Sequence, residues 1–256
     1  MKLDYNYTLL MLIFLRMTGC IFFNPILGRR NLPNIIKIGL TLMLTLFTYR
    51  LTPDRSIHID SFLVLFVSGL KELLIGFLAG YIIQLFLSVF VMGGEMSDLQ
   101  VGIAMSKIYD PQSDISMPLS ASVINAMYLL MFFATNAHLT LIEVFVKLGA
   151  VVPYGDGLVL KANLFGGLVA LFEQILVYAV QLSLPMVAVQ IIGEIGTGLM
   201  MRAVPQIDVF TVEIQIKILL GFFMMIVFVP PYAAFLQKLM NLMFARISSL
   251  YAVLAQ

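Results

Sequence analysis

The stretch SFLVLFVSGLKELLIGFLAGYIIQLFLSVFVM, from Ser61 to Met92, decides the fold class. Its only charged residues are Lys71 and Glu72, and it contains no proline that would interrupt a helix. At a rise of about 1.5 Å per residue the run would form a helix about 48 Å long. Because the hydrocarbon core of a bilayer is about 30 Å thick, such a helix must tilt, kink or project from the lipid. The run therefore predicts a membrane helix that is not a simple span.

The composition of the chain indicates the same class of protein. Hydrophobic residues make up 61% of the chain and charged residues 11%, and the mean hydropathy is +1.01. Soluble domains contain about 25% charged residues, so this chain has too little polar surface to cover a water-soluble globule. We therefore expect an all-α, polytopic membrane protein. The formal net charge of +1 provides no basic field for nucleic acid, which we exclude as a partner.

Short polar breaks separate further apolar runs. We expect helices over residues 9–23, 35–51, 119–135, 139–152, 158–192 and 207–245. The first should be an uncleaved helix, because Arg16 interrupts it and Asn24-Pro25 stands where a signal peptide has its small-residue cleavage site. The polar break Asn136-Ala137-His138 should separate two helices. The glycine-rich residues 193–198 should form a turn, and Pro230-Pro231 should kink the last run.

The most polar part of the chain is the segment from Gly93 to Pro118. Its second half contains Asp110-Pro111 and is predicted to be a loop. In its first half, Glu95 and Asp98 are three residues apart and could form a carboxylate pair on a helix, as a proton-coupled site would need. A polar helix end is the simpler interpretation, and we favour it.

Charged side chains inside apolar runs need a special environment, because burying a charge in hydrocarbon is costly. The residues of this kind are Arg16, Lys71, Glu72, Glu143, Lys147, Glu173, Glu194, Glu213 and Lys217. Glu143 and Lys147 are four apart and are expected to form an ordinary intrahelical ion pair. Gly76 and Gly80 form a GxxxG pattern, which predicts close helix packing and leaves a subunit interface as an even possibility.

The sequence contains no pattern typical of catalysis. His58 and His138 are far apart, and Cys20 is the only cysteine. H-E-x-x-H, G-x-S-x-G and Walker-type motifs are absent. We therefore expect neither an enzyme nor a bound cofactor or metal.

Three local patterns resemble one known family. The first consists of Glu95, Asp98, Gln100, Gly102 and Ala104 and leads to Asp110-Pro111. The second is Asn136-Ala137-His138, and the third comprises Arg202, Pro205, Gln206, Phe210 and Lys217. Further matches are Pro25, Gly28, Pro33 and the spacing of Glu72, Gly76 and Gly80. In this order, and over nearly the whole chain, they resemble the FliR/SctT family, core components of the export gate in bacterial flagella and injectisomes.

The sequence departs from the family pattern at four positions. Ala137 replaces a glycine, Asp208 an asparagine, Glu213 a glycine and Gln215 a proline. Three of these departures lie in or beside the third pattern. We therefore expect local contacts there to differ in this protein.

The resemblance implies a noncatalytic subunit that helps to form and seal a channel for unfolded export substrates. It implies FliP-like and FliQ-like partner subunits, with FlhB-like and FlhA-like export components, in the bacterial inner membrane. We expect the flagellar basal body rather than an injectisome. The resemblance also implies two parts, a FliP-like part over residues 1–165 and a FliQ-like helical hairpin over residues 166–256. The helices should then be broken hairpins that sit largely among other subunits.

The family also implies a loop that plugs the closed channel. The candidate plug residues are Met105, Ser106, Lys107, Ile108, Tyr109, Asp110, Pro111, Gln112 and Met117. Methionine side chains adapt to irregular contacts and could seal such a loop. The residues expected at subunit contacts or as buried charges are Glu72, Gly76, Gly80, Glu95, Asp98, Gln100, Asn136, His138, Arg202, Pro205, Gln206, Phe210 and Lys217. Among these, Glu95, Asp98, Arg202 and Lys217 are expected to hold subunits in register.

Two other functions stay open at this point. A proton- or ion-coupled transporter of small solutes could use Glu95 and Asp98, because intramembrane carboxylates often mark ion pathways. An intramembrane enzyme is the weakest alternative. A transporter should act alone or as a homo-oligomer, whereas an export-gate subunit should need heterologous partners.

Overall fold

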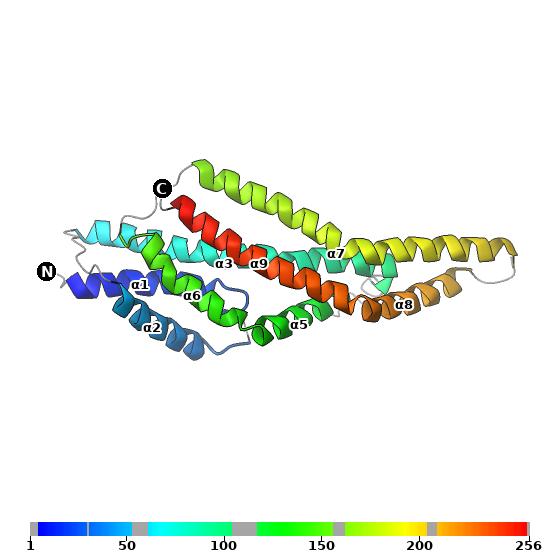
Figure 1. The fold of residues 1–256 in the computed structure, drawn as a ribbon, viewed down its shortest axis with the longest axis horizontal. Coiled ribbons are helices and arrows are strands. Elements are labelled where there is room, and N and C mark those ends of the chain that lie inside the picture. The colour runs from blue at the N-terminus through cyan, green and yellow to red at the C-terminus, as the bar shows by residue number, and fades with distance from the viewer. Residues whose placement is uncertain are drawn as a thin grey trace. The chain divides into compact units, whose positions relative to one another are not determined.

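The structure is a computed structural model that describes residues 5–29, 31–52, 61–103, 117–155, 162–203 and 209–254. Within these ranges the regular structure is entirely helical (Figure 1). The helices are α1 (Tyr5–Phe22), α2 (Asn34–Leu51), α3 (Phe62–Val101), α5 (Leu119–Ala134), α6 (Ala137–Val151), α7 (Ala162–Ala203), α8 (Val209–Val227) and α9 (Val229–Leu254). The predicted all-α class is confirmed.

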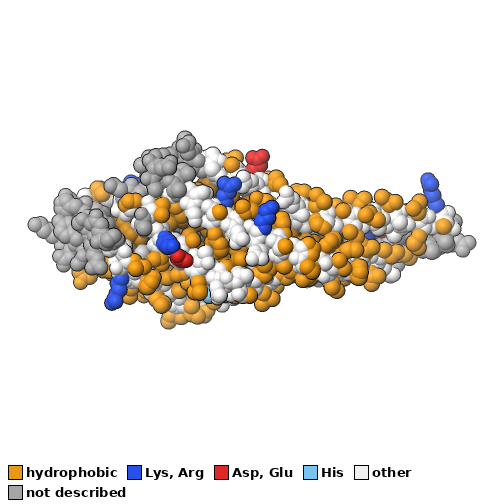
Figure 2. All heavy atoms as spheres, viewed as in Figure 1, with side chains coloured by type: hydrophobic (Ala, Val, Ile, Leu, Met, Phe, Trp, Pro, Cys, Tyr) orange, Lys and Arg blue, Asp and Glu red, His pale blue; other side chains and the backbone are white. Residues whose placement is uncertain are grey.

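Among the described residues, two helices are long and apolar enough to cross a membrane, over residues 62–101 and 166–200. Two bent pairs raise this number to as many as four if each pair forms one span, again among the described residues. Hydrophobic side chains cover most of the described surface on the face seen in Figure 2. Length, composition and surface together define an integral membrane protein.

The chain divides into two compact units. The first unit comprises Met1–Phe86, Asn136–Leu171 and Met240–Gln256, and the second comprises Leu87–Thr135 and Phe172–Leu239. Helices α3, α7 and α9 therefore each contribute residues to both units. The predicted boundary near residue 165 falls within α7. The assignment of the two halves to FliP-like and FliQ-like parts stays a prediction.

In the first unit, α1 packs against α2, α3 and α6. The crossing of α1 and α3 is closest at Gly19 and Gly76, where a Cβ atom added to Gly76 would lie 2.9 Å from the Cα of Gly19. Gly80 packs in the same way against the backbone of Phe23. The close helix contact predicted from the GxxxG pattern is thus present, and the contacting helix belongs to this chain.

In the second unit, α3 packs against α5, α7 and α8. Gly94 faces the backbone of Ala121 on α5, and Gly93 faces Ala179 on α7. On α8, Gly221 lies against the side chain of Val101. Small residues at these positions let the helix backbones approach closely, which is how helices associate in an apolar solvent.

Two predicted breaks are confirmed. Asn136 separates α5 from α6 and adopts a left-handed conformation with φ of 57°, which ends one helix and starts the next. Helices α8 and α9 are bent by 61° at Phe228, directly before Pro230-Pro231. A proline lacks the N–H of an intrahelical hydrogen bond, so the second bend has a covalent cause.

The predicted turn over residues 193–198 is wrong, because α7 continues through it to Ala203. Glycine in a helix costs only about 1 kcal/mol relative to alanine. Opening the helix in an apolar environment would cost more, since freed backbone groups would find no water there. Side chains in this stretch also bond to α3 and α8, as described below. Helix α3 continues beyond the apolar run that ends at Met92, through Glu95 and Asp98, to Val101.

Candidate functional site

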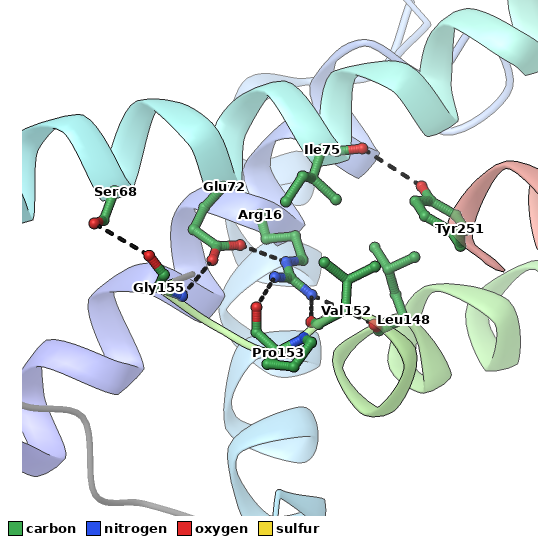
Figure 3. Close-up of polar contacts among 9 residues, drawn as sticks. All are labelled: Arg16, Ser68, Glu72, Ile75, Leu148, Val152, Pro153, Gly155 and Tyr251. Carbon is green, nitrogen blue, oxygen red and sulfur yellow. Dashed lines mark hydrogen bonds and ion pairs between the residues drawn. The ribbon is translucent and has the colours of Figure 1, made fainter. Parts of the chain in front are cut away.

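A buried arginine forms the centre of the most extensive polar site in the first unit. Arg16 lies in the middle of α1, and its Nε donates to Glu72 Oε2 on α3 at 2.5 Å (Figure 3). The side chains of the two residues are 0% and 1% exposed. A charge in such a place is tolerated only when it is paired and hydrogen-bonded. The remaining N–H groups of Arg16 therefore need acceptors as well.

These acceptors are carbonyl groups at the C-terminal end of α6. Arg16 Nη1 donates to Val152 O at 2.8 Å and to Leu148 O at 3.4 Å, while Nη2 lies 3.4 Å from Pro153 O. The last carbonyls of a helix have no intrahelical partner and carry the negative end of the helix dipole. The guanidinium thus caps α6 from a neighbouring helix.

Tyr154 and Gly155 complete the site. The Tyr154 ring lies under the Arg16 guanidinium, with 4.1 Å between the ring centroid and Cζ. Burial raises the pKa of the Tyr154 phenol to about 12, so it is neutral at physiological pH. The backbone N–H of Gly155 donates to Glu72 Oε1 at 2.9 Å, and Ser68 Oγ donates to Gly155 O at 3.4 Å. Gly155 has φ of 92°, a conformation that glycine adopts without strain.

We call this group, made of Arg16, Ser68, Glu72 and residues 152–155, the Arg16 clasp. It ties α1, α3 and the end of α6 together, as the dashed contacts in Figure 3 show. The Glu72 carboxylate and the Arg16 guanidinium bond to each other and to backbone groups. Among the described residues no group of three or more histidine, cysteine or acidic side chains could hold a metal ion. The chemistry of the clasp is structural.

The sequence predicts two of the residues in this site. Arg16 and Glu72 were both identified as charges that need a special environment, but their pairing was not predicted. The partners lie 56 residues apart, and the capped carbonyl of Val152 lies 136 residues from Arg16. The only signal in the sequence is that the run with Arg16 has no acid of its own, while a later apolar run contains Glu72 beside Lys71.

A second polar site in the second unit involves Asp98, near the end of α3. Its carboxylate accepts hydrogen bonds from the backbone N–H of Ser120, at 3.2 Å, and from the Ser120 hydroxyl. Ser120 is in the first turn of α5, where backbone N–H groups lack intrahelical acceptors and the helix dipole favours a negative charge. Asp98 is buried and caps α5, whereas Glu95 is exposed. The two carboxylates are thus in different environments, and their pairing is not observed.

A third polar site surrounds Lys217 on α8. Lys217 Nζ lies 2.7 Å from Glu194 Oε1 on α7 and 2.9 Å from Glu213 Oε1 one turn earlier on α8. Gln100 of α3 donates to Glu194 Oε1 at 3.1 Å, and Gln190 of α7 donates to the backbone carbonyl of Lys217 at 3.0 Å. We call these five residues the Lys217 cluster. It joins three helices of the second unit.

Glu213 gives the Lys217 cluster an acidic side chain at a position where the resemblance implies glycine. The local contacts at this position therefore include an ion pair that depends on the departure from the pattern. The separate Glu143–Lys147 pair on α6 is confirmed as the predicted intrahelical ion pair, with 2.5 Å between its charged atoms and both side chains exposed.

The other predicted site residues lie in varied places. Asn136 is exposed at the break before α6, His138 is half-buried in the first turn of α6, and Met117 is half-buried just before α5. Arg202 is exposed near the end of α7 in the chain by itself. The remaining residues fall outside the described ranges, apart from the backbone of Phe210: Met105, Ser106, Lys107, Ile108, Tyr109, Asp110, Pro111, Gln112, Pro205 and Gln206. Their roles stay predictions.

The protein is a polytopic α-helical membrane protein. Its class is defined by the broken helical pairs, the apolar surface and the buried polar contacts between helices. The sequence resembles known proteins over nearly its full length. This chain belongs to the family described as bacterial export proteins, family 1, whose model matches residues 7–243. The resemblance predicted from the three local patterns is thereby confirmed.

Two kinds of relative fall within this likeness. The flagellar biosynthetic protein FliR of Escherichia coli (strain K12) is 29% identical over 230 residues, covering 90% of this chain and 87% of that protein. FliR of Bacillus subtilis (strain 168) is also 29% identical, over 85% of this chain and 84% of that protein. The Yop proteins translocation protein T of Yersinia pestis is 24% identical over 97% of this chain and 95% of that protein.

Proposed function

We propose that this chain is a noncatalytic core subunit of the flagellar type III protein export gate. The observation that carries the proposal is the family match over residues 7–243, with flagellar FliR proteins aligned along most of both chains. The likeness to a Yop proteins translocation protein also supports a role in protein export. The two FliR proteins named above are 29% identical to this chain, against 24% for the Yop translocation protein, which supports the flagellar assignment.

The way in which charged side chains are used in the structure supports this role. The Arg16 clasp and the Asp98–Ser120 contact use their charged groups to join helices. The transporter alternative rested on Glu95 and Asp98 as a pair. Asp98 is engaged by Ser120 and Glu95 is exposed, so that alternative has lost its basis. Exposed Glu95 and Arg202 are instead available to pair with charges of partner subunits in register.

The partners in this proposal are FliP-like and FliQ-like subunits, with FlhB-like and FlhA-like components nearby, in the bacterial inner membrane at the flagellar basal body. Unfolded secreted proteins pass through the shared channel. The test is a pull-down of the tagged full chain from its native host in mild detergent, with mass spectrometry of the co-purifying subunits. Recovery with export subunits is expected. Recovery alone or as a homo-oligomer, with a second tag position as control, would overturn the proposal.

Within this function, residues 105–112 and Met117 form the plug of the closed channel. Support comes from the two described ends of the connection. Asp98, near the end of α3, binds Ser120, near the start of α5, so the chain leaves and returns at two points held together by hydrogen bonds. A connection with a fixed base can occlude a channel without loosening the helices that carry it.

Removal of residues 106–111 tests the plug. Cells that carry the deletion in an assembled gate should leak ions across the membrane, measured as loss of membrane potential. A matched variant with a Gly/Ser stretch of equal length separates the effect of loop length from that of composition. An assembled deletion variant with unchanged leakage would contradict the plug role and leave the export-gate assignment standing.

A further inference from the structure

Helix α2 has its polar and apolar faces reversed relative to a helix of a soluble protein. Its buried residues are Lys37, Thr41, Leu44, Thr45 and Thr48. They follow helical spacing and form one stripe, four-fifths of it polar, on the side from which α2 contacts α1 and α6. The exposed large hydrophobic residues of α2 are Ile35, Ile36, Ile38, Leu42, Met43, Leu46, Phe47 and Leu51, at 46% to 79%. We call these eight residues the outer face of α2.

Three of the four polar side chains in this stripe are hydrogen-bonded within the first unit, and the fourth, Thr48 Oγ1, is buried without a hydrogen-bond partner among the described residues. Thr41 and Thr45 each donate to the carbonyl four residues earlier, at 2.7 Å in both cases. Lys37 Nζ donates to the carbonyl of Gly28, in the turn before the helix, at 3.1 Å. These groups therefore need no water on the outside of α2. The side that the helix turns outward consists of large hydrocarbon side chains.

We propose that the outer face of α2 lies against the acyl chains of membrane lipids rather than against water or a second protein. This surface is additional to the long apolar helices identified by composition, among which α2 is not counted. The proposal goes beyond the export-gate role and does not depend on it.

Length and charge both fit a lipid occupant. An 18-residue helix is about 27 Å long, close to the thickness of a bilayer hydrocarbon core of about 30 Å. Arg29 precedes the helix and exposed Arg50 is in its last turn, so basic side chains bracket the apolar face. Residues 5–52 contain no aspartate or glutamate. Positive charge at the two ends complements the phosphates of lipid headgroups.

The kind of side chain argues against a helix of a partner subunit. Helices that associate in membranes use small residues, which allow close backbone approach, and polar groups that hydrogen-bond across the interface. The eight residues of the outer face include no small residue and no polar side chain. The exposed Gly39 nearby has open space around it. By contrast, the contact of α1 with α3 in this chain is built on Gly19 and Gly76. The outer face of α2 lacks such a contact surface.

The test is site-specific photo-cross-linking of the full chain in its native cells, with its natural partners present. A diazirine-bearing amino acid is encoded at position 43, in the middle of the outer face, and separately at position 46. Both natural residues, Met43 and Leu46, are exposed, so replacement should not disturb the fold. After illumination the chain is purified and its adducts are identified by mass spectrometry, since a carbene inserts into lipid, protein or water.

Phospholipid adducts should dominate at positions 43 and 46. Two controls calibrate the products: position 31, where Asn31 is exposed outside the helix, should react with water, and position 148, where Leu148 is buried, should react within the chain. Protein-sized adducts at position 43 would show that a partner subunit covers the face and would overturn the proposal. Dominant water adducts there would overturn it as well.

Discussion

The Arg16 clasp and the Lys217 cluster stabilise a basic side chain among apolar helices in different ways. Both place a basic side chain among apolar helices, but Arg16 and Glu72 are almost fully buried, whereas Lys217 and Glu194 are 20% and 38% exposed. Arg16 binds backbone carbonyls at a helix end, while Lys217 Nζ binds only side-chain carboxylates among the contacts above. The comparison indicates that the burial of an ion pair determines how much the stability of the fold depends on it. Removing one member of a buried ion pair should destabilise the protein strongly, whereas a residue of a more exposed pair can be substituted at small cost.

The largest effect should come from removing one charge of the deep pair. Glu72→Gln leaves the Arg16 charge buried without its counter-ion, which should lower the free energy of unfolding by about 3–5 kcal/mol. SDS titration of the purified chain, followed by circular dichroism, measures this change. Glu143→Gln is the matched control, because its exposed helical pair is worth about 0.3–0.5 kcal/mol. Equal effects in the two variants would show that burial does not govern the difference.

Arg16→Lys tests whether the clasp needs the guanidinium group or only a positive charge. Lysine keeps the charge but lacks the planar fork that reaches Glu72 and the α6 carbonyls together. The variant should therefore be much less stable than the unmodified chain, as measured by the same titration. Stability close to that of the unmodified chain would reduce the clasp to a simple charge pair.

The helix crossing that brings Arg16 to Glu72 should give the next largest effect. Gly76→Ala adds a Cβ atom against the backbone of α1, and overpacking of this kind costs about 1–3 kcal/mol. Gly39→Ala is the control, because that glycine has open space around it and alanine favours the helix. Thermal stability in detergent should fall for the first variant and stay equal or rise for the second. The reverse order would disprove the close crossing.

Loss of Lys217 should have a smaller effect. Lys217→Met removes the cation between Glu194 and Glu213, but both acids have access to solvent, so the cost should be about 1 kcal/mol after screening. The same loss measured in 1 M salt should be smaller still, since salt screens exposed pairs. A loss as large as that of Glu72→Gln would mean that the cluster is as essential as the clasp.

The smallest effect should belong to the side chain that departs from the family pattern. Glu213→Gln keeps the size of the residue and leaves Glu194 to pair with Lys217. The free energy of unfolding should change by no more than about 0.5 kcal/mol. A stability curve that overlays that of the unmodified chain is the expected result, whereas a clear loss would assign Glu213 a structural role.

The sequence predicted the helices well where apolar runs and polar breaks are local features. The breaks at Asn136 and before Pro230 were found because a polar cluster and a proline pair act on their own backbone. The turn at 193–198 was predicted wrongly because glycine signals a turn in water, whereas this stretch is helical and Glu194 within it bonds to Lys217 on α8 and to Gln100 on α3. The Arg16 clasp could not be assembled from the sequence, since its members meet only through packing.

The spacing of the Arg16 clasp along the chain also sets an order of events during synthesis. Glu72 follows Arg16 by 56 residues and Val152 follows it by 136 residues. At translation rates of about 5–20 residues per second, Arg16 waits about 3–11 s for its counter-ion and about 7–27 s for the carbonyls it caps. An unpaired arginine resists entry into hydrocarbon. Helix α1 should therefore settle late, held at the membrane surface until α3 and α6 have followed it.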